Sequence, residues 1–116
     1  MSETLVRIVD LVRAGEVQIS AHGYDEIAED GILAGEVIDG IPAAVVIEDY
    51  PTYPKGPCVL ILQRDRRGSP IHVVCGIPLG QTSPAVLVTA YRLQLAGLRI
   101  SCGGGNEREA SYQVRS

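Results

Sequence analysis

Near Ala43 the chain changes from helical to extended character. Beyond this point, segments rich in Val, Ile and Leu alternate with short connections that contain Pro, Gly or Asp, a pattern typical of strands joined by turns. The extended segments cover residues 43–50, 57–64, 70–77 and 84–92. Because the connections are only a few residues long, successive strands can pair as hairpins. The sequence therefore predicts a four-stranded, mainly antiparallel sheet.

The residues before Ala43 carry the spacing of amphipathic helices. The predicted helices cover residues 3–14, 21–30 and 33–38. Gly15 can end the first helix, a short extended piece follows at residues 17–19, and Ser20 can cap the second helix. Helices followed by strands predict an α+β fold in which two or three N-terminal helices pack on the sheet.

A chain of 116 residues is long enough for one hydrophobic core but not for two. We expect residues 1–101 to form a single domain. Residues 102–116 begin with Cys-Gly-Gly-Gly-Asn and continue with polar side chains, so we expect a flexible C-terminal tail. No apolar run approaches the roughly 18 residues of a membrane span, and the first residues are acidic and amphipathic. These features predict a cytoplasmic protein that does not enter a membrane.

The three cysteines, Cys58, Cys75 and Cys102, form no Cys-x-x-Cys pair. An odd number of cysteines in a reducing compartment predicts free thiols. The type of turn between the second and third predicted strands determines which residue lies opposite Cys58 in the neighbouring strand. A two-residue turn at Arg66-Arg67 places Cys58 opposite Cys75, whereas a type I turn with a left-handed bulge at Gly68 places it opposite the next residue, a glycine. The sequence leaves both alternatives open.

Bulky aliphatic residues occupy both faces of the predicted strands. They occur as neighbouring pairs: Val45 and Val46, Leu60 and Ile61, Val73 and Val74, and Leu87 and Val88. Two or three short helices can cover only one face well. The second face is then partly exposed, or it is covered by a partner protein or by a second copy of the chain in a homodimer.

Charge is distributed unevenly along the chain. The formal net charge is −4, which by itself argues against a simple nucleic-acid-binding protein. However, residues 1–53 contain eleven acidic and two basic residues, and residues 54–116 contain three acidic and eight basic residues. The basic half could contact phosphate groups, and the acidic half could contact a basic partner.

No strong catalytic motif is present in the sequence. There is no phosphate-binding glycine loop, no nucleophile elbow and no His-Glu-x-x-His motif, and we predict neither a cofactor nor a metal site. Metal-independent RNA cleavage requires a base, an acid and a cation near the phosphate. The candidate catalytic residues are His22, His72, Tyr91 and Arg92. The candidate RNA-binding residues are Tyr50, Lys55, Arg64, Arg66 and Arg67.

Structural roles for the same residues remain open. His22 lies four residues before Glu26, so the two could share a helix face, but two ligands make only a weak metal site. His72 alternates with apolar residues in a strand, which places it on the opposite face from Cys75, and a hydrogen-bonded structural histidine fits that position as well as a base does. A weak metal site formed by His22 and His72 is a third alternative.

Several segments together resemble a known family. They are Ser20-x-His22, residues 27–32, residues 46–51, residues 70–74 and residues 88–92. Over roughly residues 16–92 the chain resembles the bacterial and archaeal family named domain of unknown function 4258. The residues that match the family pattern are His22, Glu48, Tyr50, His72 and Tyr91.

The resemblance also implies a function. Members of this family look like partners of zinc-finger antitoxins of the YgiT and MqsA type. That association implies a relative of the RelE and MqsR toxins, which are small α+β proteins that cleave mRNA. Our first hypothesis is therefore a toxin-like, RNA-cleaving module whose partner is an antitoxin protein. The alternative is a non-catalytic protein-binding or self-associating module that uses an apolar sheet face, in which case a charged residue at Val46 or Val74 should abolish association.

Overall fold

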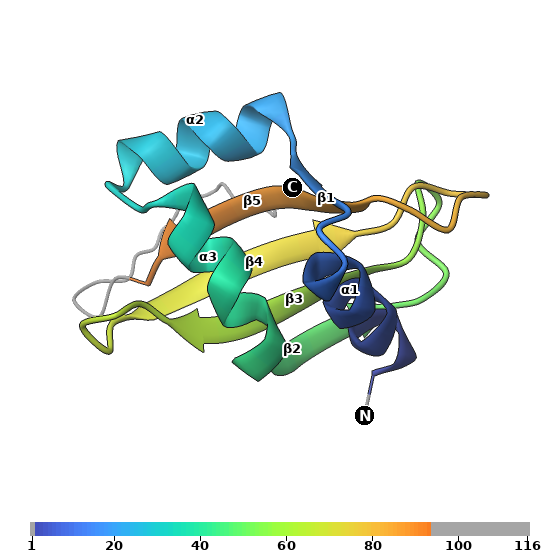
Figure 1. Ribbon diagram of the computed structural model, residues 1–116, viewed down its shortest axis with the longest axis horizontal. Coiled ribbons are helices and arrows are strands. Elements are labelled where there is room, and N and C mark those ends of the chain that lie inside the picture. The colour runs from blue at the N-terminus through green and yellow to red at the C-terminus, as the bar shows by residue number, and fades with distance from the viewer. Residues whose placement is uncertain (1, 94–116) are drawn as a thin grey trace.

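In the computed structural model, which describes residues 2–93, helices precede a sheet as the sequence predicts (Figure 1). The described helices are α1 (Glu3–Arg13), α2 (Ala21–Glu29), α3 (Ala34–Gly40) and the short 3-10 helix η1 (Ile41–Ala43). The described strands are β1 (Val17–Ile19), β2 (Val45–Tyr50), β3 (Cys58–Arg64), β4 (Pro70–Gly76) and β5 (Ala85–Arg92). The predicted α+β class is confirmed. The predicted domain end at residue 101 and the predicted tail at 102–116 lie outside the described residues.

The sheet contains one more strand than the sequence predicts. Its order is β1-β5-β4-β3-β2, and β2 to β5 form antiparallel pairs. The added strand, β1, pairs in parallel with β5, with Val17 opposite Ala85. β1 is only three residues long and pairs with a strand far along the chain. No local pattern in the sequence could therefore reveal this pairing. The five-stranded sheet is mixed, but β2 to β5 pair antiparallel, which agrees with the predicted mainly antiparallel sheet.

The helices lie on one side of the sheet. In Figure 1, α1 and α3 cross in front of the strands and α2 runs beside β5. Alternate strand residues on this side, such as Ile61, Val73 and Leu87, are fully buried together with Ile8 of α1 and Ile41 of η1. No helix among residues 2–93 is long and apolar enough to span a membrane.

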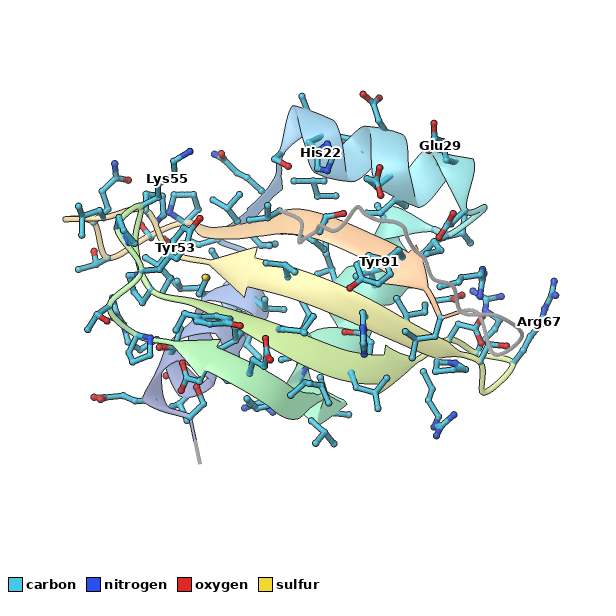
Figure 2. All side chains as sticks on the ribbon, turned by 180° about the vertical axis from the view of Figure 1, so that it is seen from behind. His22, Glu29, Tyr53, Lys55, Arg67 and Tyr91 are labelled. Atoms are coloured by element: carbon cyan, nitrogen blue, oxygen red, sulfur yellow. The ribbon has the colours of Figure 1, made fainter. Side chains whose placement is uncertain are left out.

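The other alternate residues point to the opposite side of the sheet. This side faces the viewer in Figure 2. We call this side the open face, because no described helix lies over it. Strand pairing assigns it the side chains of Val45, Glu48, Tyr50, Cys58, Leu60, Leu62, Arg64, His72, Val74, Thr89 and Tyr91. The prediction that short helices cover only one face of a largely aliphatic sheet is confirmed for the described residues.

The β3–β4 hairpin decides between the two cysteine alternatives. Cys58 lies opposite Gly76, and Gly68 adopts a φ of +85°, which glycine tolerates because it has no Cβ. The bulged turn is therefore the correct alternative. Cys75 is buried under the helices, where burial raises the pKa of its thiol to about 12, and both described cysteines are free.

Helix α2 is attached to β5 at its first turn. As predicted, Ser20 caps the helix: its Oγ accepts a hydrogen bond from the Gly23 amide at 2.9 Å and donates one to the Val88 carbonyl at 2.9 Å. The cap alone typically stabilises a helix by about 1 kcal/mol. A Cβ on Gly23 would lie 3.0 Å from the carbonyl oxygens of Leu87 and Val88, so the absence of a side chain lets α2 approach the strand closely.

Candidate functional site

Two candidate residues meet near the middle of the open face. His72 of β4 and Tyr91 of β5 are direct cross-strand neighbours. The His72 Nδ1 and Tyr91 Oη atoms are 3.3 Å apart, and the two rings meet edge to face with centroids separated by 5.5 Å. As predicted, His72 points to the face opposite Cys75. The register of β4 and β5 therefore creates a polar pair within a largely aliphatic surface.

The environment of His72 favours the neutral imidazole. The side chain is half-buried between its strand neighbours, and this burial lowers its pKa below 6.5, while the negative charge of Glu48 opposes the shift in part. The imidazole is therefore largely unprotonated at pH 7. A neutral imidazole can accept a proton, which is the property required of a general base.

Aliphatic side chains extend from this pair toward the β2 edge of the sheet. On one side, Leu62 of β3 lies opposite His72, and Val45 of β2 lies opposite Leu62. Val45 is 62% exposed. Val45, Leu62, His72 and Tyr91 thus form one row across four strands of the open face. The two polar rings lie at the β5 end of this row.

A second polar pair lies on β2. The Tyr50 hydroxyl donates a hydrogen bond to the Glu48 carboxylate, and this bond is the main reason that the pKa of Tyr50 is raised. Tyr50 lies opposite Cys58, at the other end of the open face from Arg64. Together, Tyr50, His72 and Tyr91 place three rings along the open face.

The three arginines of the β3–β4 hairpin have different surroundings. Arg64 lies on the open face one row beyond Leu62, and its Nη1 donates a hydrogen bond to the Gly68 carbonyl at 2.9 Å. Arg66 forms an ion pair with Glu36 of α3 at 2.7 Å, and Arg67 is exposed at the tip. Arg64 is thus the arginine of this hairpin that lies next to the row of His72.

Arg92 joins three parts of the structure. Its Nη1 contacts Oδ2 of Asp65 in the hairpin at 2.7 Å, and its Nε donates to the backbone carbonyl of Asp30 at the end of α2. Its backbone amide also donates to the Asp30 carboxylate at 2.8 Å. The Asp65 side chain is only 4% exposed, and its Oδ1 accepts hydrogen bonds from the Arg67 and Ser69 amides. The guanidinium predicted as catalytic is therefore engaged in holding α2 and the hairpin to β5.

The bonds to Asp65 have a clear electrostatic effect. The hydrogen bond from Arg92, followed by that from the Ser69 amide, lowers the pKa of Asp65 from 3.8 to about 2. Asp65 is therefore ionised under all ordinary conditions. This cluster of Asp30, Arg92 and Asp65 is a structural junction at the end of β5.

Comparison with known proteins identifies the family. A family sequence profile described as domain of unknown function (DUF4258) matches residues 19–92. The chain belongs to the DUF4258 family. The matched DUF4258 region runs from the last residue of β1 to the last residue of β5, so it contains the open face, whereas α1 precedes it. No curated protein and no solved structure matches the chain.

Other predicted site residues of this DUF4258 domain lie apart from the His72–Tyr91 pair. His22 is exposed on the first turn of α2, outside the open face (Figure 2). Lys55 lies with Tyr53 in the β2–β3 connection, at the end of the sheet opposite Arg67 (Figure 2). Within residues 2–93, no group of three or more His, Cys, Asp or Glu side chains could hold a metal ion.

Sequence reasoning missed two features of the site. The first is the partnership of Arg92 with Asp30 and Asp65, which lie in distant segments. A local signal exists only for Asp65, since an aspartate that starts a turn ending in glycine commonly accepts hydrogen bonds from the turn amides. The second is the negative charge that Glu48 of β2 exerts on His72, which depends on the order of the strands.

Proposed function

We propose that the open face binds single-stranded RNA and that His72 acts as the general base in its cleavage. The observation that carries this proposal is the contact between a neutral, half-buried His72 and Tyr91 on an exposed sheet surface. Proton abstraction from a ribose hydroxyl requires an unprotonated base within reach of the substrate. The lowered pKa of His72 supports the first requirement, and its position on the open face supports the second.

The proposed chemistry follows from the two nitrogen atoms of the imidazole. In the tautomer that carries its proton on Nδ1, His72 donates a hydrogen bond to Tyr91 Oη and keeps a lone pair on Nε2. Nε2 accepts the proton of the 2′-hydroxyl, and the 2′-oxygen attacks the adjacent phosphorus. The bond to the 5′-oxygen breaks, that oxygen takes a proton from water, and Nε2 of His72 gives its proton to the hydroxide that remains. The products are a 2′,3′-cyclic phosphate and a 5′-hydroxyl.

The side chains near the His72–Tyr91 pair are suited to binding single-stranded RNA. Bases of single-stranded RNA stack on aromatic side chains, and Tyr50, His72 and Tyr91 present three rings on the open face. Arg64 in the adjacent row supplies a positive charge for the phosphate as negative charge develops on it. Residues 54–93 contain five basic residues and one acidic residue, so this half of the domain attracts a polyanion.

A toxin–antitoxin role is part of the same proposal. An enzyme that cleaves mRNA without restraint stops protein synthesis, so such an enzyme needs a partner that inhibits it. The chain belongs to the DUF4258 family, and the role rests on the association with zinc-finger antitoxins that the resemblance to this family implies. We therefore expect expression of the chain alone to arrest growth and co-expression of a neighbouring antitoxin to restore it.

The cleavage proposal can be tested with one nucleotide sequence prepared as single-stranded RNA, as duplex RNA and as single-stranded DNA. Purified protein in EDTA should cut a labelled single-stranded RNA and leave 2′,3′-cyclic phosphate ends. The corresponding duplex should be cut at least about tenfold more slowly, because paired bases cannot stack on the open face. The DNA strand of the same sequence should remain intact because it lacks the 2′-hydroxyl. Intact RNA after prolonged incubation, or equal cleavage of the DNA, would contradict the proposal.

A second candidate function is non-catalytic association through the open face. The 62% exposure of Val45 favours it, since large exposed β-branched residues are typical of contact surfaces. Val74 also lies on this face, but Val46 packs against the core beneath the helices. A charge at Val46 would therefore disturb folding rather than association alone, and Val45 is the better position.

Sedimentation velocity can test this second function. If the open face mediates self-association, wild-type protein should sediment as a dimer and Val45→Asp as a monomer. The exposed turn variant Thr52→Asp is the matched control and should leave the dimer unchanged. A wild-type monomer at all concentrations up to about 100 µM would exclude stable self-association through this face.

A further inference from the structure

The strand β2 forms one edge of the sheet. Among the described strands it pairs only with β3, and five of its six residues are exposed (Figure 1). An edge strand presents backbone N–H and C=O groups that have no strand partner on the outer side. β2 is therefore a template on which another extended segment can form hydrogen bonds.

The side chains of β2 guard this edge against some partners but not against others. Proteins commonly guard an edge strand with charged side chains, especially lysine, or with proline or a bulge. Residues 45–50 include neither lysine nor proline, the charged residues Glu48 and Asp49 are both negative, and Val45 and Ile47 are exposed. A register shift between Val46 and Glu48 interrupts the pairing once, but Glu48 to Tyr50 continue in regular register with β3.

Negative charge lies on both sides of the same edge. Glu48 lies opposite Leu60 and so belongs to the open face, whereas Asp49 lies opposite the buried Val59 and so belongs to the helix side. Asp49 also lines a depression of about 400 Å³ together with Glu3 and Arg7 of α1. β2 itself contains no basic residue.

These charges indicate which kind of segment can pair with the β2 edge, a second copy of β2 or a basic segment of another protein. Antiparallel pairing of β2 with β2 of a second copy would bring four carboxylates into one short ribbon, and like charges in neighbouring cross-strand positions are destabilising. A segment with adjacent basic residues would instead place one cation on each side of the sheet, near Glu48 and Asp49. The charge pattern therefore favours a basic segment over a second copy.

We propose that the β2 edge binds an extended, basic segment of a partner protein, which adds a strand to the sheet. Backbone hydrogen bonds supply most of the affinity, and the contacts with Glu48 and Asp49 supply the preference for lysine or arginine. The edge does not include His72 or Tyr91, although Glu48 also lies on the open face and its charge acts on His72. Use of the edge does not depend on RNA cleavage.

The proposal can be tested with short synthetic peptides and fluorescence anisotropy. The probe is fluorescein-labelled Thr-Val-Lys-Lys-Val-Thr, in which the adjacent lysines point to opposite faces. The full chain should bind this probe at least about tenfold more tightly than the glutamate version, Thr-Val-Glu-Glu-Val-Thr. N-methylation of every backbone amide should weaken binding by about tenfold or more, because it removes the donors that pair with the edge.

Variants of the protein distinguish recognition by Glu48 and Asp49 from nonspecific binding of the peptide. Glu48→Gln combined with Asp49→Asn should weaken binding of the basic probe about fivefold. The matched control is Asp25→Asn combined with Glu29→Gln, two exposed carboxylates of α2, and it should bind as wild type does. Equal binding of the basic and acidic peptides, undiminished binding of the N-methylated peptide, or no binding at about 1 mM would overturn the proposal. A wild-type dimer that Ile47→Lys dissociates would also overturn it, because a second copy would then occupy the edge.

Discussion

Replacing His72 by glutamine is expected to lower the single-turnover rate of RNA cleavage by about 10² to 10⁴-fold. Glutamine keeps a polar side chain at this half-buried position but cannot accept the proton of the 2′-hydroxyl. RNA binding should weaken far less than the cleavage rate, because the substitution removes one of the three rings on the open face while Tyr50 and Tyr91 remain. The measurement is cleavage of a labelled single-stranded RNA with enzyme in excess, together with the Kd for a non-cleavable RNA analogue.

The chain offers a matched control for this substitution. His22→Gln changes the second histidine of the sequence, which is exposed on α2 and lies outside the open face. It should cleave RNA at close to the wild-type rate. If His22→Gln and His72→Gln lose activity equally, or if neither does, His72 is not the general base.

Replacing Arg92 by methionine is expected to cause a large loss of stability. The substitution keeps much of the side-chain volume but leaves the nearly buried Asp65 carboxylate without its cation and releases the carbonyl of Asp30. We expect the melting temperature at pH 7 to fall by about 10 °C. Arg67→Met changes an exposed arginine of the same hairpin and should stay within about 3 °C of wild type. Equal melting temperatures for the two variants would show that the junction does not stabilise the fold.

The same junction predicts how stability depends on pH. The pKa of Asp65 is about 2 in the folded protein, below its ordinary value of 3.8, so the ionised carboxylate stabilises the folded state. This contribution is fully present above about pH 4 and is lost as the pH falls toward 2. The difference in melting temperature between wild type and Arg92→Met should therefore narrow over that range.

Local patterns in the sequence were sufficient to predict most of the helices and strands. Periodicity placed α1 and α2, the Ser20 cap followed from residue type, and Pro- and Gly-containing turns separated β2 to β5. Residues 17–19 were predicted as an extended piece, but their parallel pairing with β5 could not be predicted, because the partner strand lies far along the chain. The turn at Gly68 was one of two stereochemically acceptable alternatives, and only the observed register distinguishes them.

The candidate site was predictable only in part. Strand alternation was enough to place His72 opposite the buried Cys75, but it could not pair His72 with Tyr91, because that contact depends on the register between β4 and β5. The register of β5 includes an irregularity between its pairings with Val74 and Cys75, which no sequence pattern reveals. Arg92 was a reasonable candidate cation by residue type, and only the three-dimensional structure shows that Asp30 and Asp65 engage it.

The pH dependence of RNA cleavage tests the role of His72 most directly. Because burial lowers the pKa of His72, kcat/KM for the wild-type protein should rise as the pH increases and should level off above a pKa that lies below 6.5. His72→Gln should lack this rise and remain low throughout. A wild-type activity that falls as the pH increases above 6.5, or a His72→Gln variant with the wild-type profile, would contradict the assignment of His72 as the base.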